Sequence, residues 1–212
     1  MGARPTYGWL GEETGGEAGA DPTRRWIVDP LDGTTNFLHG MPHWAISIAL
    51  EHKGEIVSAV VYDPAKDEMF WAEKGAGAWL NDNRRLRVSG RRSMAEAVFA
   101  TGVPFGAKKT LPAMLADLAR LMPACAGVRR WGAASLDLAY VAAGRFDGYW
   151  ERELQPWETR PEGPTRAVGN RGILQCRPSA LCRQDSRDSL ASPPVLMRRL
   201  ESGAELRGRH VE

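Results

Sequence analysis

The sequence of 212 residues predicts a layered α/β protein, and two patterns carry this prediction. Apolar segments with strand-like alternation recur between residues 26 and 103, separated by short turns that contain Gly, Asn, Asp or Pro. Two later segments repeat apolar residues at steps of three and four, which is the period of an amphipathic helix. Hairpin-connected strands combined with helices are typical of a sheet covered by helices.

The strands are expected mainly in the first half of the chain, as a meander of antiparallel hairpins. Trp26–Val28 has the apolar character of a buried strand end, and Pro30 and Gly33 are expected to break that strand. Lys53–Gly54 and the segment 63–67 provide turns between the strands that follow. In chain order, the further strands are expected at 43–52, 55–62, 68–73, within 75–83, and in the apolar run 97–103.

Two helices are expected in the second half of the chain. The segment 110–122 carries apolar residues at helical spacing, and Pro112 is tolerated there because it falls in the first turn. The segment 134–143 repeats the pattern, and Gly144 stands where a helix often ends.

Composition and charge argue against several classes of protein. Apolar residues make up 43% of the chain and the formal net charge is +2, which gives no electrostatic case for nucleic acid or a membrane surface as the main partner. No apolar run has the length of a membrane span and the N-terminus lacks the signal-peptide pattern, so a cytoplasmic location is expected. The three cysteines lack CxxC or Cys/His spacing, which speaks against a disulfide framework and a zinc site.

The most informative segment is Trp26–Phe37, with the sequence WIVDPLDGTTNF. Asp29, Asp32 and the backbone carbonyl of Leu31 can turn toward one point after the strand, and Mg²⁺ prefers oxygen ligands of this kind. The glycine turn and hydroxyl that follow suit a phosphate group beside the metal. The alternative is an Asx-type turn, in which the two Asp side chains only cap the following segment.

This segment resembles the first signature of the inositol monophosphatase family, a hydrophobic strand followed by Asp-Pro-x-Asp-Gly-Thr-x-Asn-Phe. Gly11–Glu13 precedes the signature at about the family's distance. Trp131–Gly144 is similar to the family's substrate-side loop and following helix, and Phe146–Glu151 to the strand after it. The resemblance covers about residues 7–157. It implies an α+β, αβαβα sugar-phosphatase architecture, a Mg²⁺ cofactor and, by analogy, a homodimer.

The resemblance also implies roles for individual residues. Glu12, Asp29 and the Leu31 carbonyl would hold a first Mg²⁺, and Asp29 would bridge to a second ion held by Asp32 and Glu158. Thr34 would orient or deprotonate the attacking water, and turn N–H groups would cradle the phosphate. The implied substrate-binding residues are Asp32, Gly33, Thr34, Gly132, Ala133 and Glu151, the last of which would reach the substrate's hydroxyl groups.

Simpler roles remain open for several of these residues. Thr34 could cap a helix N-terminus, Glu12 could lie in a solvated loop, and Gly132–Ala133 could be an ordinary helix start. Glu158 stands where the family has Asp, and its extra methylene suits the near-octahedral geometry of Mg²⁺ poorly. His43 lacks a metal-ligand spacing and is expected to pack or to face solvent.

Two regions are expected along the chain, a family-like domain over 1–157 and a different tail over 158–212. All 17 aromatic residues lie at or before Trp157, whereas the tail contains ten Arg and no aromatic residue or Lys, so it is expected to be disordered or only locally ordered. A frameshift in the encoding DNA would explain the break at Glu158. The segment before Glu12 is also shorter than the family's two N-terminal helices, so an incomplete domain is expected.

The expected function is therefore metal-dependent hydrolysis of a phosphomonoester, by water attack on myo-inositol monophosphate or a similar small polyol phosphate. A related enzyme acting on histidinol phosphate, fructose bisphosphate or a 3′-phosphonucleotide is one alternative. The other is an inactive fragment that acts, if at all, as a binding or regulatory protein. The expected partners are a small phosphorylated substrate and a second copy of the chain, with no membrane and no indication of nucleic acid.

Overall fold

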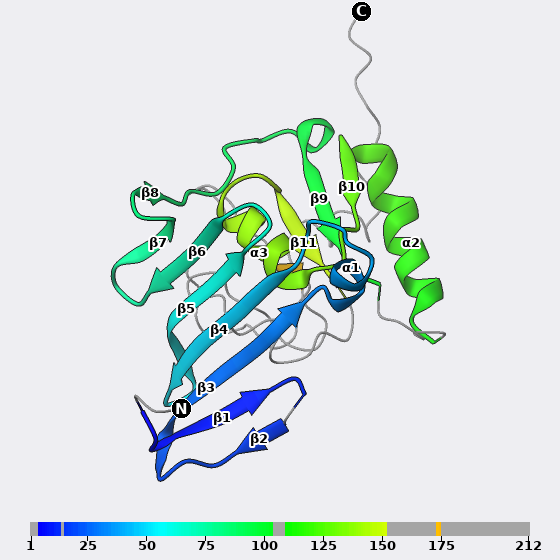
Figure 1. Cartoon of the computed structure of the whole chain (residues 1–212). Coiled ribbons are helices and arrows are strands. Elements are labelled where there is room, and N and C mark those ends of the chain that lie inside the picture. Colours follow the sequence, from blue (N-terminus) through cyan, green and yellow to red (C-terminus); the bar gives the residue numbers. More distant parts are fainter. Residues whose placement is uncertain (1–3, 14, 104–108, 152–172, 175–212) are drawn as a thin grey trace, which may run out of the picture.

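The structure is a computed structural model that describes residues 4–13, 15–103, 109–151 and 173–174. The chain forms two sheets with helices beside and between them, which confirms the predicted layered α/β class (Figure 1). The first sheet contains β1 (Tyr7–Gly11), β2 (Gly15–Glu17), β3 (Asp21–Asp32), β4 (Ala45–His52), β5 (Glu55–Asp63), β6 (Glu68–Glu73), β7 (Gly77–Leu80) and β8 (Arg84–Arg85). The second contains β9 (Val98–Thr101), β10 (Gly127–Arg129), β11 (Gly148–Trp150) and β12 (Ile173–Leu174). The helices are α1 (Thr34–Leu38), α2 (Leu111–Leu121) and α3 (Ala134–Ala142), with single turns at Met94–Glu96 and Met122–Ala124.

The first sheet has the strand order β2-β1-β3-β4-β5-β6-β7-β8, and β3 to β8 form the expected antiparallel meander. The turn between β4 and β5 uses Lys53 and Gly54 with φ of 54° and 81°, as a tight two-residue hairpin requires. Alternate residues of β5 point into the core, where Ala59 and Val61 are buried.

Strand β3 is longer than the sequence suggests, because it continues through Pro30 to Asp32. The expectation that Pro30 breaks this strand is wrong. The register with β4 shifts between Asp29 and Asp32, so these residues form a bulge in which proline does not interrupt a regular ladder. A bulge redirects side chains, and this one lies within the acidic motif.

Strand β1 was not expected, and it runs parallel to β3. Gly11 at the end of β1 lies opposite Val28 of β3. The carboxyl ends of parallel strands meet at one edge of a sheet, so the residues that follow these two, Glu12 and Asp29, are neighbours.

The second sheet has the order β10-β9-β11-β12, and its first three strands are parallel. Strand β10 was not expected, because three residues are too few to show an alternating pattern. Strand β12 pairs antiparallel with β11 and falls within the region expected to be a tail. Apart from Ile173–Leu174, residues 152–212 lie outside the described residues, so the predictions for the tail and for Glu158 stay predictions. No helix of the described chain is long and apolar enough to cross a membrane.

Both expected helices are present. Helix α2 begins with Pro112 in its first turn and buries Met114 and Leu121. Helix α3 is enclosed on all sides rather than amphipathic, since every residue from Ala134 to Val141 is buried. It contacts β4 and β5 of the first sheet and β9 and β11 of the second. The helix ends at Ala142, and Gly144 follows its C-cap residue with a φ of 70°. Its N-terminus is thereby fixed against the motif after β3.

Candidate metal and phosphate site

The acidic side chains of the motif are buried at the end of β3. Asp29 is 2% exposed and Asp32 is 8% exposed, while Glu12 lies on the surface beside them. The backbone N–H of Leu31 donates a hydrogen bond to Oδ1 of Asp29 at 3.0 Å, which fixes that carboxylate within the bulge. The parallel register of β1 and β3 brings Glu12 within hydrogen-bonding reach of Asp29.

The carboxylate of Asp32 is held by the N-terminus of α3. The backbone N–H of Ser135 donates to Oδ2 of Asp32 at 2.8 Å, and the Ser135 hydroxyl donates to the same oxygen. The helix dipole adds partial positive charge at this end of α3. A segment 103 residues away in the sequence therefore positions the second Asp of the motif.

Burial and mutual repulsion shift the ionisation of both acids. Burial, with the nearby charges of Asp32 and Glu12, raises the pKa of Asp29 to about 8. Burial also raises the pKa of Asp32, although the hydrogen bonds from Ser135 and Ala134 oppose the shift. A cation that binds beside these carboxyl groups would stabilise their charged form, so cation binding would lower their raised pKa.

The turn after Asp32 depends on Gly33, which has a φ of 86° that favours glycine. Gly33 occupies the N-cap of α1 and Thr34 is the first helical residue, so the alternative role of Thr34 as an N-cap is wrong. The Thr34 hydroxyl instead donates to the backbone oxygen of Leu31 at 3.0 Å. Its oxygen lone pairs remain available to accept a hydrogen bond from a water molecule.

The loop before α3 packs directly on this turn. A Cβ atom added to Gly33 would lie 3.2 Å from Cβ of Ala133 and 3.3 Å from the oxygen of Gly132. Ala133 is also the N-cap of α3, so the ordinary helix-start role and a place beside the site hold together. The structure thus places Gly132 and Ala133 next to Gly33, while their role in substrate binding stays a prediction.

Glu151 follows β11, and its carboxylate accepts a hydrogen bond from the hydroxyl of Tyr149. Its side chain covers Gly102, where even a Cβ atom would collide with the carboxylate. The charges of Glu151 and Asp32 both act on Asp137, so Asp137 lies electrostatically between these two acids.

Three residues of the site region were missed by the sequence predictions. Ser135 holds Asp32, Asn36 bridges two loops, and Asp137 lies buried with a raised pKa, caused by burial and then by Asp32 and Glu151. Among the described residues, Oδ1 of Asp137 has no hydrogen-bond partner. A polar residue inside an apolar helical segment was the signal available for Ser135 and Asp137.

The donor set suits a hard cation but is not a complete cage by itself. Within the described ranges, no group of three His, Cys, Asp or Glu side chains is arranged as a finished metal cluster. The chemistry of the donors nevertheless fits Mg²⁺, which takes carboxylate and carbonyl oxygens and keeps several waters. Glu12, Asp29, Asp32 and the Leu31 carbonyl supply such oxygens at one edge of the sheet. Glu158, the further expected ligand, lies outside the described residues.

Known proteins resemble the part of the chain that builds this site. The curated inositol-1-monophosphatase of Rhizobium meliloti is 60% identical over 158 residues, which are 74% of this chain and 59% of that protein. The Nus factor SuhB of Pseudomonas aeruginosa is 52% identical over 163 residues, covering 74% of this chain and 59% of that protein. The crystal structure of the extragenic suppressor protein suhB from Bartonella henselae is 52% identical, with a TM-score of 0.72, and the match covers 76% of this chain and 62% of that one.

The chain spans about three fifths of the length of these curated relatives. The model of the inositol monophosphatase family matches residues 3–159, which include both strands and the loop that contribute to the site. The chain therefore belongs to the inositol monophosphatase family.

Proposed function

We propose that this chain carries the metal-binding part of a Mg²⁺-dependent phosphomonoesterase that acts on inositol monophosphate or a similar small polyol phosphate. One observation carries the proposal: two buried carboxylates, Asp29 and Asp32, form no ion pair among the described residues and adjoin the left-handed turn at Gly33. Family membership and the relative named inositol-1-monophosphatase support the reaction class.

Glu12, Asp29, Asp32 and the carbonyl of Leu31 would hold the metal. When bound, Mg²⁺ neutralises charge on a phosphoryl group and lowers the pKa of water. Asp29 is the central ligand in this proposal, because it is close to both other acids. These roles are assigned to the domain over 1–157, to which β12 of the following segment adds a strand beside β11.

Thr34 would orient the attacking water. Its hydroxyl proton is engaged by the oxygen of Leu31 at 3.0 Å, so its oxygen is directed to accept a hydrogen bond. This arrangement favours orientation over proton removal, since the hydroxyl of Thr34 donates to a backbone carbonyl, which is not a base that could take its proton.

The remaining residues would bind the substrate. The N–H groups of Gly33 and Thr34 are suited to phosphate oxygens, because a turn with a left-handed residue groups its N–H dipoles. Gly132 and Ala133 would form the facing wall, and Glu151 would accept hydrogen bonds from hydroxyl groups of a polyol.

A phosphate-release assay tests the proposal. The full chain would be incubated with inositol 1-phosphate, histidinol phosphate, fructose 1,6-bisphosphate and a 3′-phosphonucleotide, with Mg²⁺ or with EDTA. We expect Mg²⁺-dependent release that is greatest for inositol 1-phosphate and lost in Asp29→Asn. Glu55→Gln is the matched control, because Glu55 pairs with Lys74 on the far, exposed side of the sheet.

A second candidate function comes from the relatives named Nus factor SuhB. A chain that acts through a protein partner would not need turnover. A folded chain that releases no phosphate above background, either with Mg²⁺ or with EDTA, would favour this second function over the first.

A further inference from the structure

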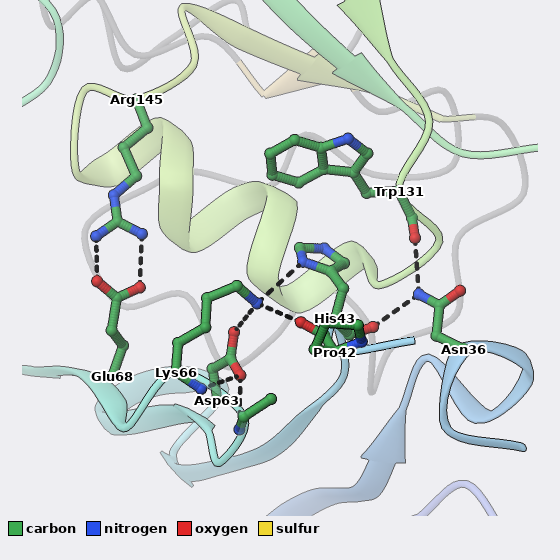
Figure 2. Close-up of polar contacts among 9 residues, drawn as sticks. Asn36, Pro42, His43, Asp63, Lys66, Glu68, Trp131 and Arg145 are labelled. Atoms are coloured by element: carbon green, nitrogen blue, oxygen red, sulfur yellow. Dashed lines mark hydrogen bonds and ion pairs between the residues drawn. The ribbon is translucent and has the colours of Figure 1, made fainter. Parts of the chain in front are cut away.

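Asn36 joins three parts of the candidate site through one side chain. It lies in α1, two residues after Thr34, and is 5% exposed. Its Nδ2 atom donates to the backbone oxygen of His43 at 2.7 Å and to the backbone oxygen of Trp131 at 2.7 Å, so both amide hydrogens are used (Figure 2). The two acceptors are 7 and 95 residues away in the sequence.

These acceptors belong to the segments that enclose Gly33. A Cβ atom added to Gly33 would lie 3.1 Å from the oxygen of His43 and 3.3 Å from the oxygen of Gly132. Trp131 directly precedes Gly132, so the bond from Asn36 spans the same narrow contact. The amide group of Asn36 therefore holds the turn at a set distance from the loop before α3, in addition to the hydrogen bonds that Ser135 donates to Asp32.

The acceptor segments are themselves held from the other side. The ring of His43 packs edge-on against Trp131, with ring centroids 4.9 Å apart. Lys66 donates from Nζ to the oxygen of Pro42 at 2.7 Å and pairs with the buried Asp63 at 2.6 Å (Figure 2). Because the segments that carry both acceptors have these further contacts, we expect a change at Asn36 to act mainly on the turn.

We propose that Asn36 is a positioning residue, which sets the distance between the turn at Gly33–Thr34, where the phosphate would bind, and the loop at Gly132–Ala133, which would form the facing wall of the same site. The inference rests on the proposed function, because that function assigns the phosphate to the turn and the facing wall to the loop. It differs from a general structural role, since α3 and the first sheet pack through a separate apolar cluster that includes Val61, Phe70 and Leu136.

The test compares Asn36→Asp with two controls. The substitution keeps the shape of the side chain but removes the donor, so two buried carbonyls face a carboxylate. Asn81→Asp is the matched chemical control, because Asn81 also bonds backbone groups but lies at the end of β7, away from the site. Leu121→Val is the stability control, since Leu121 belongs to the apolar cluster under α2.

Two measurements are made on each full-length variant: binding of inorganic phosphate in Mg²⁺ by calorimetry, and amide hydrogen exchange at 33–38, 131–135 and 68–80. In Asn36→Asp we expect about 10-fold weaker phosphate binding and faster exchange in both site segments, with 68–80 unchanged. Asn81→Asp and Leu121→Val should bind phosphate as the parent does.

Three results would overturn the inference. Phosphate binding equal to the parent's in Asn36→Asp, or an equal loss in Leu121→Val, would show that Asn36 has no specific role. If Asn36→Asp does not fold, Asn36→Ala is measured instead, because it also removes both donors, and unchanged phosphate binding in that variant would have the same meaning. A parent chain that binds no phosphate would refute the proposed function, and this inference with it.

Discussion

The first sheet contains two groups of buried or partly buried carboxylates, and these groups differ in their partners. Asp63 is fully buried and pairs with Lys66 at 2.6 Å, and Glu68 accepts from Nη1 of Arg145 at 2.6 Å. Asp29 and Asp32, at the end of β3, receive only N–H and O–H donors and form no ion pair among the described residues. Cations of the fold pair with the first group, whereas the second has no such partner among the described residues and would be charged when a cation binds.

The ionisation of the two groups follows this difference. The hydrogen bonds from Arg145 lower the pKa of Glu68, so that acid stays charged. Burial and neighbouring acids raise the pKa of Asp29 and of Asp32. A buried charge without a partner destabilises a fold, so its retention is typical of a functional site rather than a structural one.

The largest expected effect is that of Asp29→Asn. We expect kcat/KM for inositol 1-phosphate to fall about 1,000-fold or more, because the central metal ligand loses its charge. In EDTA the same variant should have a higher Tm than the parent, since a repelling buried acid is removed. Both values come from a phosphate-release assay and a thermal melt. Activity within a few-fold of the parent would contradict the metal assignment.

The opposite result is expected for Asp63→Asn. The substitution removes the ion pair between Oδ2 of Asp63 and Nζ of Lys66, while the amide oxygen can still accept from the N–H groups of Ala65 and Lys66. We expect the free energy of unfolding in urea to fall by about 2–3 kcal/mol, while the Mg²⁺-induced increase in Tm is kept. If the Mg²⁺ response disappeared in this folded variant, the division into a structural and a metal-binding group would be wrong.

A smaller effect is expected for Ser135→Ala, which removes the hydroxyl donor to Asp32 but keeps the backbone donor. We expect about 10-fold weaker Mg²⁺ binding by titration, because the groups that orient a metal ligand contribute this much. Unfolding free energy should change by about 1 kcal/mol or less. Thr101→Val, which removes a buried hydroxyl donor to Trp150, is the control and should leave Mg²⁺ affinity as in the parent.

The smallest expected effect is a pH dependence specific to Asp29. Its pKa is about 8 in the folded protein, against an ordinary value of about 4 in the unfolded chain. Between these values the folded state holds the extra proton, so the stability of the metal-free protein contributed by this group falls as pH rises. Urea unfolding at pH 5 and pH 8 should show the decline in the parent and a weaker one in Asp29→Asn. Saturating Mg²⁺ should oppose the decline, and an identical slope in all three samples would refute the assignment.

Much of the fold was predictable from short segments. The meander from β4 to β7 follows from alternation and turn residues, and α2 and α3 follow from three- and four-residue spacing. The residues of the acidic motif could also be identified from the sequence, because they lie close together along the chain.

Other features could not be read from the sequence. The bulge at Pro30 depends on the pairing of β3 with β4, and the proximity of Glu12 to Asp29 depends on a parallel strand pair. The enclosure of α3 depends on the second sheet, in which β9 precedes α3 in the sequence and β11 follows it.

By itself, the sequence determined which groups are present: the carboxylates, the glycine turn and the local periodicities that form strands and helices. Only the tertiary structure decided how they are used, because Ser135 reaches Asp32 across 103 residues and Asn36 reaches Trp131 across 95. Such contacts arise from the packing of α3 against the end of β3, and no local pattern encodes that packing. The same packing removes Asp29 and Asp32 from water, and their burial is the physical reason that their charges call for a metal ion.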